Sequence, residues 1–196
     1  MRVIAGKARR INLISPSGMD VRPTQDRIKE TLFNILQDDI PGCRFLDLFA
    51  GTGGIGIEAL SRGAAHASFV ERDKKALACI RENLAKTRLA DDAAVYSMDV
   101  MAALGGYMSD SGVYDIIFAD PPYHEEYEER LIRALSLSTA VGPETIIIIE
   151  AALETELDFI DDTCFEIYRV KDYKSNRHIF IRKKLNTEGI YERVKD

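Results

Sequence analysis

The sequence Asp120-Pro121-Pro122-Tyr123 directly follows an apolar stretch, Tyr114–Ala119, and combines residue types suited to one kind of chemistry. Two consecutive prolines restrict φ and remove two backbone N–H donors, so the turn is rigid. The Asp120 carboxylate and the Pro121 carbonyl can then form a fixed pair of acceptors for the two protons of an exocyclic amine. Tyr123 offers a flat face on which a base can stack. The pattern predicts a pocket for the amino group of a nucleobase.

Such a pocket would make a weak nucleophile reactive. A nucleobase amine attacks poorly because its lone pair is delocalised into the ring. Acceptors that hold both protons draw the nitrogen toward tetrahedral geometry, so that a methyl group in line can be transferred through orientation and electrostatics. A base inside a helix cannot reach this pocket, so the target is flipped out or single-stranded. We predict that the catalytic residues are Asp120, Pro121, Pro122 and Tyr123.

A glycine-rich turn, with Gly51, Gly53 and Gly56, separates an earlier apolar stretch from a helix-forming segment. Glycine lets the backbone approach a ligand closely, and the first N–H groups of a helix are available as donors. The spacing matches the dinucleotide fingerprint, and Glu71 ends the next apolar stretch, where an acidic residue can bind ribose hydroxyls. No Gly-Lys-Ser/Thr follows, which argues against a P-loop. The pattern indicates an adenosine-containing cofactor without identifying it.

Acidic residues are expected at the ends of successive strands, at Asp47, Glu71 and Asp99. A carboxylate beside the glycine loop would repel the pyrophosphate of NAD, but it would attract the sulfonium and ammonium groups of S-adenosylmethionine. The acidic pocket therefore favours S-adenosylmethionine as the cofactor. The residues predicted to bind it are Asp47, Phe49, Gly51, Thr52, Gly53, Glu71, Arg72, Asp99, Val100 and Asp120.

Strands and helices alternate through most of the chain and must position these residues. Stretches with strand-like composition are Phe45–Phe49, Ala67–Glu71, Ala93–Ser97, Tyr114–Ala119 and Thr145–Glu150. Helices are predicted over Ile55–Ser61, Lys74–Lys86, Val100–Tyr107, Glu126–Leu137 and Glu154–Phe159. Phe165–Val170 and His178–Lys183 are predicted to form a closing antiparallel pair. This alternation predicts an α/β fold with a mostly parallel sheet covered on both faces.

Residues 1–42 precede this alternation and are predicted to form an extension, with residues 43–196 as the catalytic domain. Within the extension, Val3–Ile4 and Ile11–Ile14 would form short strands around a basic turn. Thr24 is placed to cap a helix over Gln25–Leu36.

The net charge of −6 over 196 residues argues against a nucleic-acid partner until it is divided along the chain. Residues 1–30 carry a net charge of +4 and residues 169–184 carry +6, whereas residues 31–168 carry −15. The average therefore conceals an acidic body with basic ends. Basic segments of this kind permit local binding of phosphate groups.

Other features of the composition narrow the class of protein. No apolar run approaches the roughly 20 residues that span a bilayer, and the start of the chain lacks the apolar stretch of a signal peptide. Cys43, Cys79 and Cys164 are far apart and are interpreted as buried thiols in a reducing cytoplasm. The histidines have no spacing typical of a metal site.

Together these motifs resemble the class I S-adenosylmethionine-dependent methyltransferases that methylate amines. More narrowly, the chain is similar to the bacterial RsmD family of 16S rRNA guanine-N2 methyltransferases. The most family-specific stretch is Arg22–Leu36, and the similarity extends almost from end to end. The other matching stretches are RVIAGKARRINL before it and, after it, LDLFAGTGGIGIEALSRGA, VERDKKALACIRENL and FADPPYHEEY.

The resemblance implies a Rossmann-like, three-layer α/β/α fold whose seven-stranded sheet has an antiparallel last strand. It implies methylation of the 2-amino group of one guanine, conventionally position 966, in the 16S rRNA of the small ribosomal subunit. We therefore expect a cytoplasmic monomer with an RNA partner, without a metal or a membrane. Phosphates on either side of the pocket would be bound by Arg2, Lys7, Arg9, Arg10, Lys171, Lys174 and Arg177.

Two positions depart from the family pattern, and other functions are compatible with part of these motifs. Arg10 and Lys174 stand where the family has glycine, which leaves the shape of two loops undecided. The target amine could instead be adenine N6 of DNA or RNA, or a protein glutamine, although Asp120 rather than asparagine before two prolines disfavours glutamine. An NAD-dependent oxidoreductase would share the glycine loop but leave Asp120–Tyr123 unexplained. A non-catalytic RNA-binding module would not require either motif to be intact.

Overall fold

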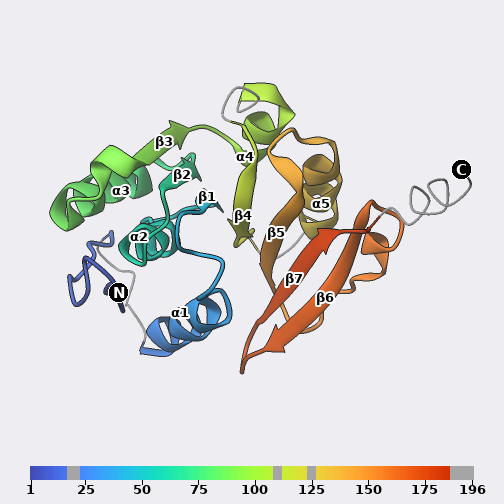
Figure 1. The fold of residues 1–196 in the computed structure, drawn as a ribbon, viewed down its shortest axis with the longest axis horizontal. Helices are drawn as coiled ribbons and strands as arrows, with labels where there is room; N and C mark the ends of the chain where they lie inside the picture. Colours follow the sequence, from blue (N-terminus) through green and yellow to red (C-terminus); the bar gives the residue numbers. More distant parts are fainter. Residues whose placement is uncertain (17–22, 108–111, 123–126, 186–196) are drawn as a thin grey trace, which may run out of the picture.

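Short, mostly apolar stretches build a seven-stranded sheet at the centre of the computed structural model (Figure 1). The structure describes residues 1–16, 23–107, 112–122 and 127–185. The strands lie side by side in the order β3-β2-β1-β4-β5-β7-β6. Their bounds are β1 Arg44–Leu48, β2 His66–Glu71, β3 Ala93–Ser97, β4 Tyr114–Ala119, β5 Val141–Ala151, β6 Phe165–Asp172 and β7 Arg177–Lys183.

The pairing of the strands confirms the predicted sheet. The neighbours from β3 to β5 are all parallel, whereas β7 runs antiparallel between β5 and β6. Strand β6 therefore runs in the same direction as β5. In a parallel sheet the carboxyl ends of the strands share one edge, where open α/β folds bind ligands. The glycine loop after β1, the Asp-Pro-Pro turn after β4 and the β6–β7 turn all lie at that edge.

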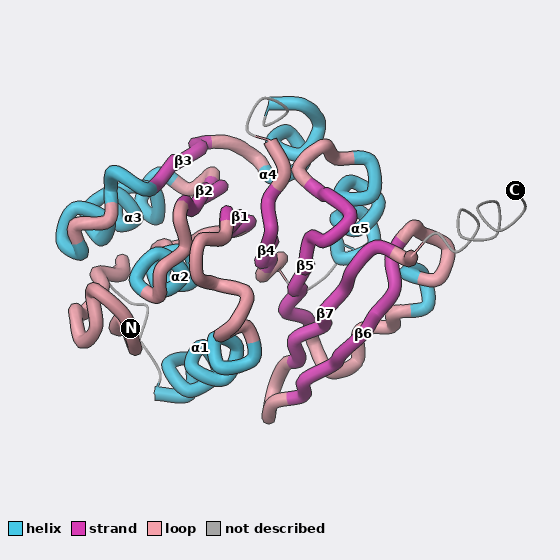
Figure 2. The backbone as a smooth tube through the Cα atoms, in the orientation of Figure 1, coloured by secondary structure: helices cyan, strands magenta, loops and turns pink. Residues whose placement is uncertain are grey.

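Helices cover both faces of the sheet, as predicted (Figure 2). The helices α1 Pro23–Ile35, α2 Gly54–Ser61 and α3 Lys74–Thr87 pack on one face, against strand residues such as Phe45 and Phe69. The other face contacts two helices, α4 Val100–Ala102 and α5 Tyr127–Leu137, and two turns, the π-helical η2 Ala103–Tyr107 and the 3-10 turn η4 Asp158–Ile160. A further 3-10 turn, η1 Ala90–Asp92, precedes β3. Alternate residues of each strand point to opposite faces, which produces the two separate cores.

Three predicted helices differ from the structure. The helix predicted over Val100–Tyr107 is divided into the short α4 and the π-helical turn η2, with a non-helical backbone at Gly106. The helix predicted over Glu154–Phe159 is wrong, since only the turn η4 forms there. Leu157 and Ile160 both pack on the second core, and a 3-10 turn aligns side chains three positions apart. Thr24 is not a cap, because α1 begins one residue earlier at Pro23. Proline is favoured in the first turn of a helix, where its missing N–H has no partner to lose.

Residues 1–14, here called the N-terminal segment, form less regular structure than the predicted strands. Arg2 and Asn12 make an isolated antiparallel bridge, flanked by a hydrogen bond of 2.9 Å from the Val3 N–H to the Ile11 carbonyl. Val3 is buried in the same core as helices α1 and α2, so the segment packs directly on the rest of the molecule. The boundary between residues 42 and 43 stays a prediction.

Three further predictions concern composition. Cys43 and Cys79 are buried, but Cys164 is exposed, so the prediction of three buried thiols is wrong for the residue that precedes β6 at the protein surface. Within the described residues, no helix has the length and apolar character needed to cross a bilayer. The same part of the chain contains no cluster of three His, Cys, Asp or Glu side chains suited to a metal ion.

Candidate active site

A cavity of about 570 Å³, here called the glycine-loop cavity, opens at the carboxyl edge of the sheet. Acidic groups reach it from three neighbouring strand ends, at Asp47, Glu71 and Asp120. Its lining comprises Met1, Ser15, Pro16, Asp47, Phe49, Ala50, Gly51, Thr52, Gly54, Ile55, Glu71, Asp73, Ala76, Phe118 and Asp120. Six of the residues predicted to bind the cofactor therefore line one space: Asp47, Phe49, Gly51, Thr52, Glu71 and Asp120.

The backbone of the loop explains its glycines. Gly51 has φ +54° and Gly53 has φ +80°, both in the left-handed region that favours glycine. Gly53 stands at the start of α2 and is absent from the lining of the cavity, so its contact with the cofactor stays a prediction. Phe49 also has a positive φ, +62°, which is uncommon for a residue with a side chain. Residues with such strained backbone conformations are found most often at functional sites.

Asp47 is buried beneath this loop, with 2% of its surface exposed. Its Oδ2 accepts a hydrogen bond of 2.8 Å from the Gly56 N–H, at the start of α2. Removal from water raises the pKa of Asp47 to about 7, despite the opposing effect of that hydrogen bond and with a smaller contribution from Glu71. A buried carboxyl group that is costly to ionise is stabilised when a cation arrives. The position therefore suits a positively charged ligand group.

Glu71 is held rigidly at the rim of the cavity. Its Oε2 accepts from the Gly51 N–H at 2.9 Å, and its Oε1 accepts from the N–H groups of Arg72 and Asp73 at 2.7 and 2.8 Å. A carboxylate has about four acceptor positions, so one remains for a hydroxyl group. This rigid acceptor is placed as a ribose-binding carboxylate should be.

A second and smaller cavity of about 60 Å³, here called the apolar slot, adjoins the first through Phe49 and Glu71. Its walls are mostly apolar: Phe49, Val70, Met98, Val100, Pro122 and Tyr127, with Glu71, Arg72 and Asp99 at the edge. Asp99 caps α4 through the Met101 N–H at 2.9 Å and lies 3.4 Å from an Arg72 nitrogen. Apolar and aromatic walls with a polar edge suit the flat face of a purine.

Asp120 lies where β4 ends, beside a second carboxylate that the sequence analysis did not identify. Ala119 pairs with Ile149, so Asp120 and Glu150 occupy the next position on the two parallel strands. Glu150 in turn pairs with His178 across the antiparallel strands β5 and β7. These three side chains, here called the polar row, run across β4, β5 and β7 on the face that also carries Phe118 and Phe180.

The electrostatics of Asp120 follow from this arrangement. The group is open to solvent in the cleft, yet the surrounding protein, Glu150 and Asp47 raise its pKa to about 7, in that order of importance. Like charges that share a site disfavour ionisation of both. Donors placed between the two carboxylates would relieve that repulsion.

The other members of the predicted catalytic turn are placed less fully. Pro121 is buried and Pro122 lines the apolar slot. Tyr123 lies outside the described residues.

The polar row lines a third cavity of about 130 Å³, here called the Glu150 cavity, together with Met1, Ile28, Lys29, Ile55 and Phe118. Met1 and Asp120 also line the glycine-loop cavity, so the two spaces adjoin. Sequence reasoning missed Met1, Lys29, Glu150 and His178. For Glu150 a signal existed, because it ends the apolar run Thr145–Glu150 just as Asp120 follows its own strand.

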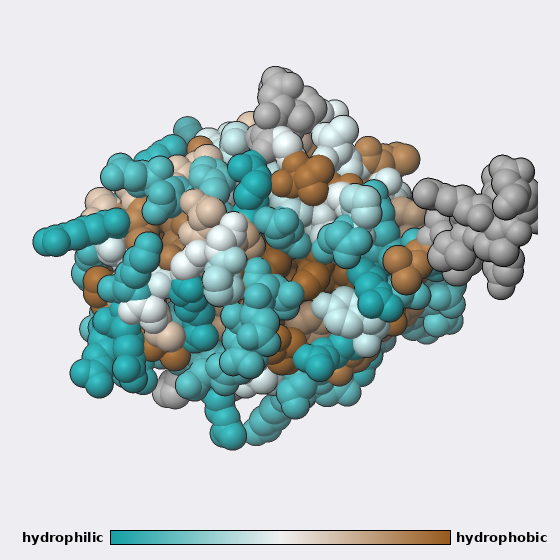
Figure 3. All heavy atoms as spheres, viewed as in Figure 1, coloured by the Kyte–Doolittle hydropathy of each residue, from teal (hydrophilic) through white to brown (hydrophobic). Residues whose placement is uncertain are grey.

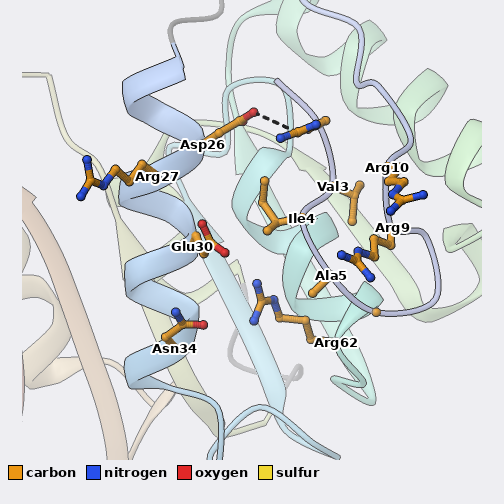
Figure 4. Close-up of a pocket in the computed structure, with 12 residues that line it drawn as sticks. Val3, Ile4, Ala5, Arg9, Arg10, Asp26, Arg27, Glu30, Asn34 and Arg62 are labelled. Carbon is orange, nitrogen blue, oxygen red and sulfur yellow. Dashed lines mark ion pairs between the residues drawn. The ribbon is translucent and has the colours of Figure 1, made fainter.

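The basic residues predicted to bind RNA belong to two parts of the chain, the N-terminal segment and the β6–β7 hairpin (Figure 1). Arg2, Arg9 and Arg10 line a hollow of about 760 Å³ between the N-terminal segment and α1, with Arg62 pointing into it (Figure 4). Lys7 is exposed on the same segment. Arg10 has a φ of +72°, in the left-handed region that favours glycine.

The second group belongs to the β6–β7 turn. Lys171 pairs with His178, which extends the polar row outward across β6. Lys174 is exposed, and Arg177 lies 3.0 Å from Asp172. In Figure 3, hydrophilic atoms border this face of the molecule, and hydrophobic atoms are visible toward its middle.

Comparison with known proteins places this geometry in context. The family model described as Conserved hypothetical protein 95 matches residues 1–182. Ribosomal RNA small subunit methyltransferase D of Escherichia coli (strain K12) is 36% identical over 158 residues, which are 80% of this chain and 77% of that protein. The same-named protein of Haemophilus influenzae is 33% identical over 159 residues, 80% of this chain and 81% of its own length. The solved Escherichia coli structure yhhF, provisionally described as a methyltransferase, superposes with a TM-score of 0.80 at 31% identity, covering 94% of this chain and 98% of that one.

Proposed function

The chain belongs to the family described as Conserved hypothetical protein 95, which confirms the resemblance to the RsmD family, and from this premise we propose that it methylates the exocyclic N2 of a guanine in 16S rRNA. S-adenosylmethionine is the proposed methyl donor. The observation that supports the proposal most directly is Asp120, which lines both the glycine-loop cavity and the Glu150 cavity. An amine held at Asp120 would therefore face a ligand bound at the glycine loop.

The residues around the glycine-loop cavity fit this donor. The buried Asp47 carboxyl suits the ammonium of the amino-acid part, and Glu71 offers its remaining acceptor position to the ribose. The apolar slot suits the adenine ring, with Phe49 and Tyr127 as aromatic walls. When bound, the cofactor supplies a methyl group on a positively charged sulfur.

The protein's own contribution is to position the amine. The Asp120 carboxylate and the Pro121 carbonyl each accept a hydrogen bond from the amine. The nitrogen lone pair is then directed toward the glycine-loop cavity. Orientation of this kind lowers the barrier without requiring a strong base. The methylated nitrogen is acidic and loses a proton to water. Asp120 must be ionised, because only the carboxylate accepts the hydrogen bond from the amine and stabilises the positive charge that develops on the nitrogen.

RNA is proposed to approach across the two basic groups. Arg9 and Arg10 on the N-terminal segment and Lys171 and Lys174 near the β6–β7 turn would contact phosphates, while the cleft between them receives the flipped base. We expect the protein to act as a cytoplasmic monomer on the small ribosomal subunit, and the guanine conventionally numbered 966 is the proposed target.

The test is transfer of a tritiated methyl group to small subunits from a strain that lacks the enzyme, followed by identification of the modified base. N2-methylguanine is the expected product. Methyl groups recovered on adenine would contradict the substrate, and recovery on ribosomal protein would point to glutamine instead. A calorimetric titration separates the cofactors, because S-adenosylmethionine should bind and NAD should not.

A further inference from the structure

The Glu150 cavity holds more recognition chemistry than capture of an amine requires. We propose that Glu150 selects guanine, by accepting the N1–H of the base whose 2-amino group is held by Asp120. This inference rests on the proposed function and assigns a further substrate-binding residue to the same site.

The register of the sheet places two carboxylates side by side. Asp120 and Glu150 stand next to each other at the carboxyl ends of β4 and β5, and both line the Glu150 cavity. The 2-amino group and the N1–H of guanine are adjacent donors on one edge of the base. Two neighbouring carboxylates match two neighbouring donors, because each carboxylate oxygen is an acceptor only.

Neighbouring side chains hold the Glu150 carboxylate in place. Its Oε2 lies 3.1 Å from His178 Nε2, and its Oε1 accepts from the Asn176 amide. His178 is 1% exposed, and its Nδ1 lies 3.2 Å from the Tyr173 hydroxyl. If the Tyr173 hydroxyl donates to Nδ1, the imidazole N–H at Nε2 donates to Glu150. The Glu150 carboxylate held in this way lines the cavity beside Asp120.

The other charged group in this cavity is committed elsewhere. The Lys29 ammonium donates to the Arg2 carbonyl at 2.7 Å and lies 3.1 Å from Glu58 and 3.5 Å from the Gly54 carbonyl. Lys29 therefore holds the wall of the cavity together and does not compete for Glu150. A ligand with two adjacent donors would relieve the repulsion between Asp120 and Glu150.

This arrangement discriminates between bases. Adenine and cytosine also carry an exocyclic amine, but the ring nitrogen beside it is an acceptor. A carboxylate facing that nitrogen would be repelled and left without a partner. Sites built to bind a donor reject analogues that lack it far more strongly than apolar pockets reject a missing methylene. Glu150 would thus exclude adenine even though Asp120 accepts any amine.

The test compares guanine with 2-aminopurine, which keeps the 2-amino group but presents an acceptor at N1. Small subunits are assembled with either base at the modified position, and kcat/KM for methyl transfer is measured for each. The wild-type protein should prefer guanine by about 100-fold. Glu150→Gln should reduce that ratio at least about tenfold, because the glutamine amide can donate to N1. A purely structural role would lower both rates together and leave the ratio unchanged.

Glu144→Gln is the matched control, since it makes the same change at an exposed position of β5. It should retain the wild-type ratio. Should Glu150→Gln not fold, Glu150→Asp replaces it: the carboxylate is withdrawn by one methylene, and the guanine preference should fall about tenfold. An unchanged ratio in the folded variant overturns this inference alone. A wild-type protein that places no methyl on guanine N2 overturns the proposed function and this inference with it.

Discussion

The Lys29 ammonium lies 3.1 Å from the Glu58 carboxylate, and only 4% and 0% of the two side chains are exposed. Glu58 also accepts the N–H groups of Ile4 and Ala5, at 2.8 and 3.0 Å. One buried ion pair therefore joins α1, α2 and the N-terminal segment. Since Met1 lines both adjoining cavities, this ion pair also positions part of the active site.

Replacing one member of that pair should be costly. Lys29→Met removes one of the two cations that contact Glu58, since Arg62 Nε stays 2.8 Å from Glu58 Oε1, and it should reduce the free energy of unfolding by about 1–3 kcal/mol. The loss is measured by urea unfolding. Lys29→Met with Glu58→Gln should cost less than the sum of the two single changes, because the residues interact directly. Additive losses would show that the pair is not coupled.

Asp120→Ala should abolish methyl transfer and leave cofactor binding nearly intact. The substitution removes an acceptor of the amine, whereas Asp47, Glu71 and the apolar slot are unchanged. Turnover should fall at least about 1000-fold, and the calorimetric Kd for S-adenosylmethionine should change only a few-fold. Asp91→Ala, at an exposed position, is the control. Wild-type turnover in Asp120→Ala would refute the catalytic assignment.

The pH dependence of kcat/KM for the RNA should report the titration of Asp120. Partial removal from water by the walls of the cleft and the neighbouring carboxylates raise its pKa to about 7, so the accepting, ionised form is lost as pH falls below that value. The rate should therefore drop on the acid side, measured with saturating cofactor so that Asp47 contributes little. Glu150→Gln removes a negative neighbour, lowers the pKa of Asp120 and should move the acid limb to lower pH. An unmoved limb would exclude this electrostatic coupling.

Gly56→Ala should distort the turn that supports Asp47. A Cβ at this position would lie 2.4 Å from the Phe69 ring, and the Gly56 N–H donates to Asp47. Overpacking of this kind costs about 1–3 kcal/mol of stability. The same change should weaken S-adenosylmethionine binding. Gly105→Ala is the matched control, because no atom lies within 4 Å of its added Cβ. Equal thermal stability of the two variants would contradict the packing argument.

Neutralising Arg9 and Arg10 together should weaken RNA binding and flatten its salt dependence. If each side chain neutralises one phosphate, the slope of log K against log salt should decrease by about 1.4 for single-stranded RNA. The slope is measured by filter binding at several salt concentrations. Lys74→Gln with Lys75→Gln removes two adjacent exposed charges at the start of α3 and should leave the slope unchanged. Equal slopes for wild type and the arginine variant would argue against this contact.

Local patterns carry much of the fold. The strands Ala93–Ser97 and Tyr114–Ala119 were predicted with the bounds the structure shows, because a short, mostly apolar run is a feature of neighbouring residues. The helix predicted over Glu154–Phe159 was wrong for the opposite reason, because packing on the second core overrode the local helix preference. The glycine loop and Asp120 were found because a turn and its neighbouring strand are contiguous in the chain.

The sequence by itself thus determined the alternation of elements, the glycine loop and the rigid Asp-Pro-Pro turn, each of which is encoded by neighbouring residues. Only the tertiary structure placed Glu150 between Asp120 and His178, and only it brought Met1 to the wall of both cavities. The physical reason is that strand register and the buried Lys29–Glu58 contact join residues far apart in the chain. Such pairings depend on the packing of the whole sheet, which no local pattern of residue types records.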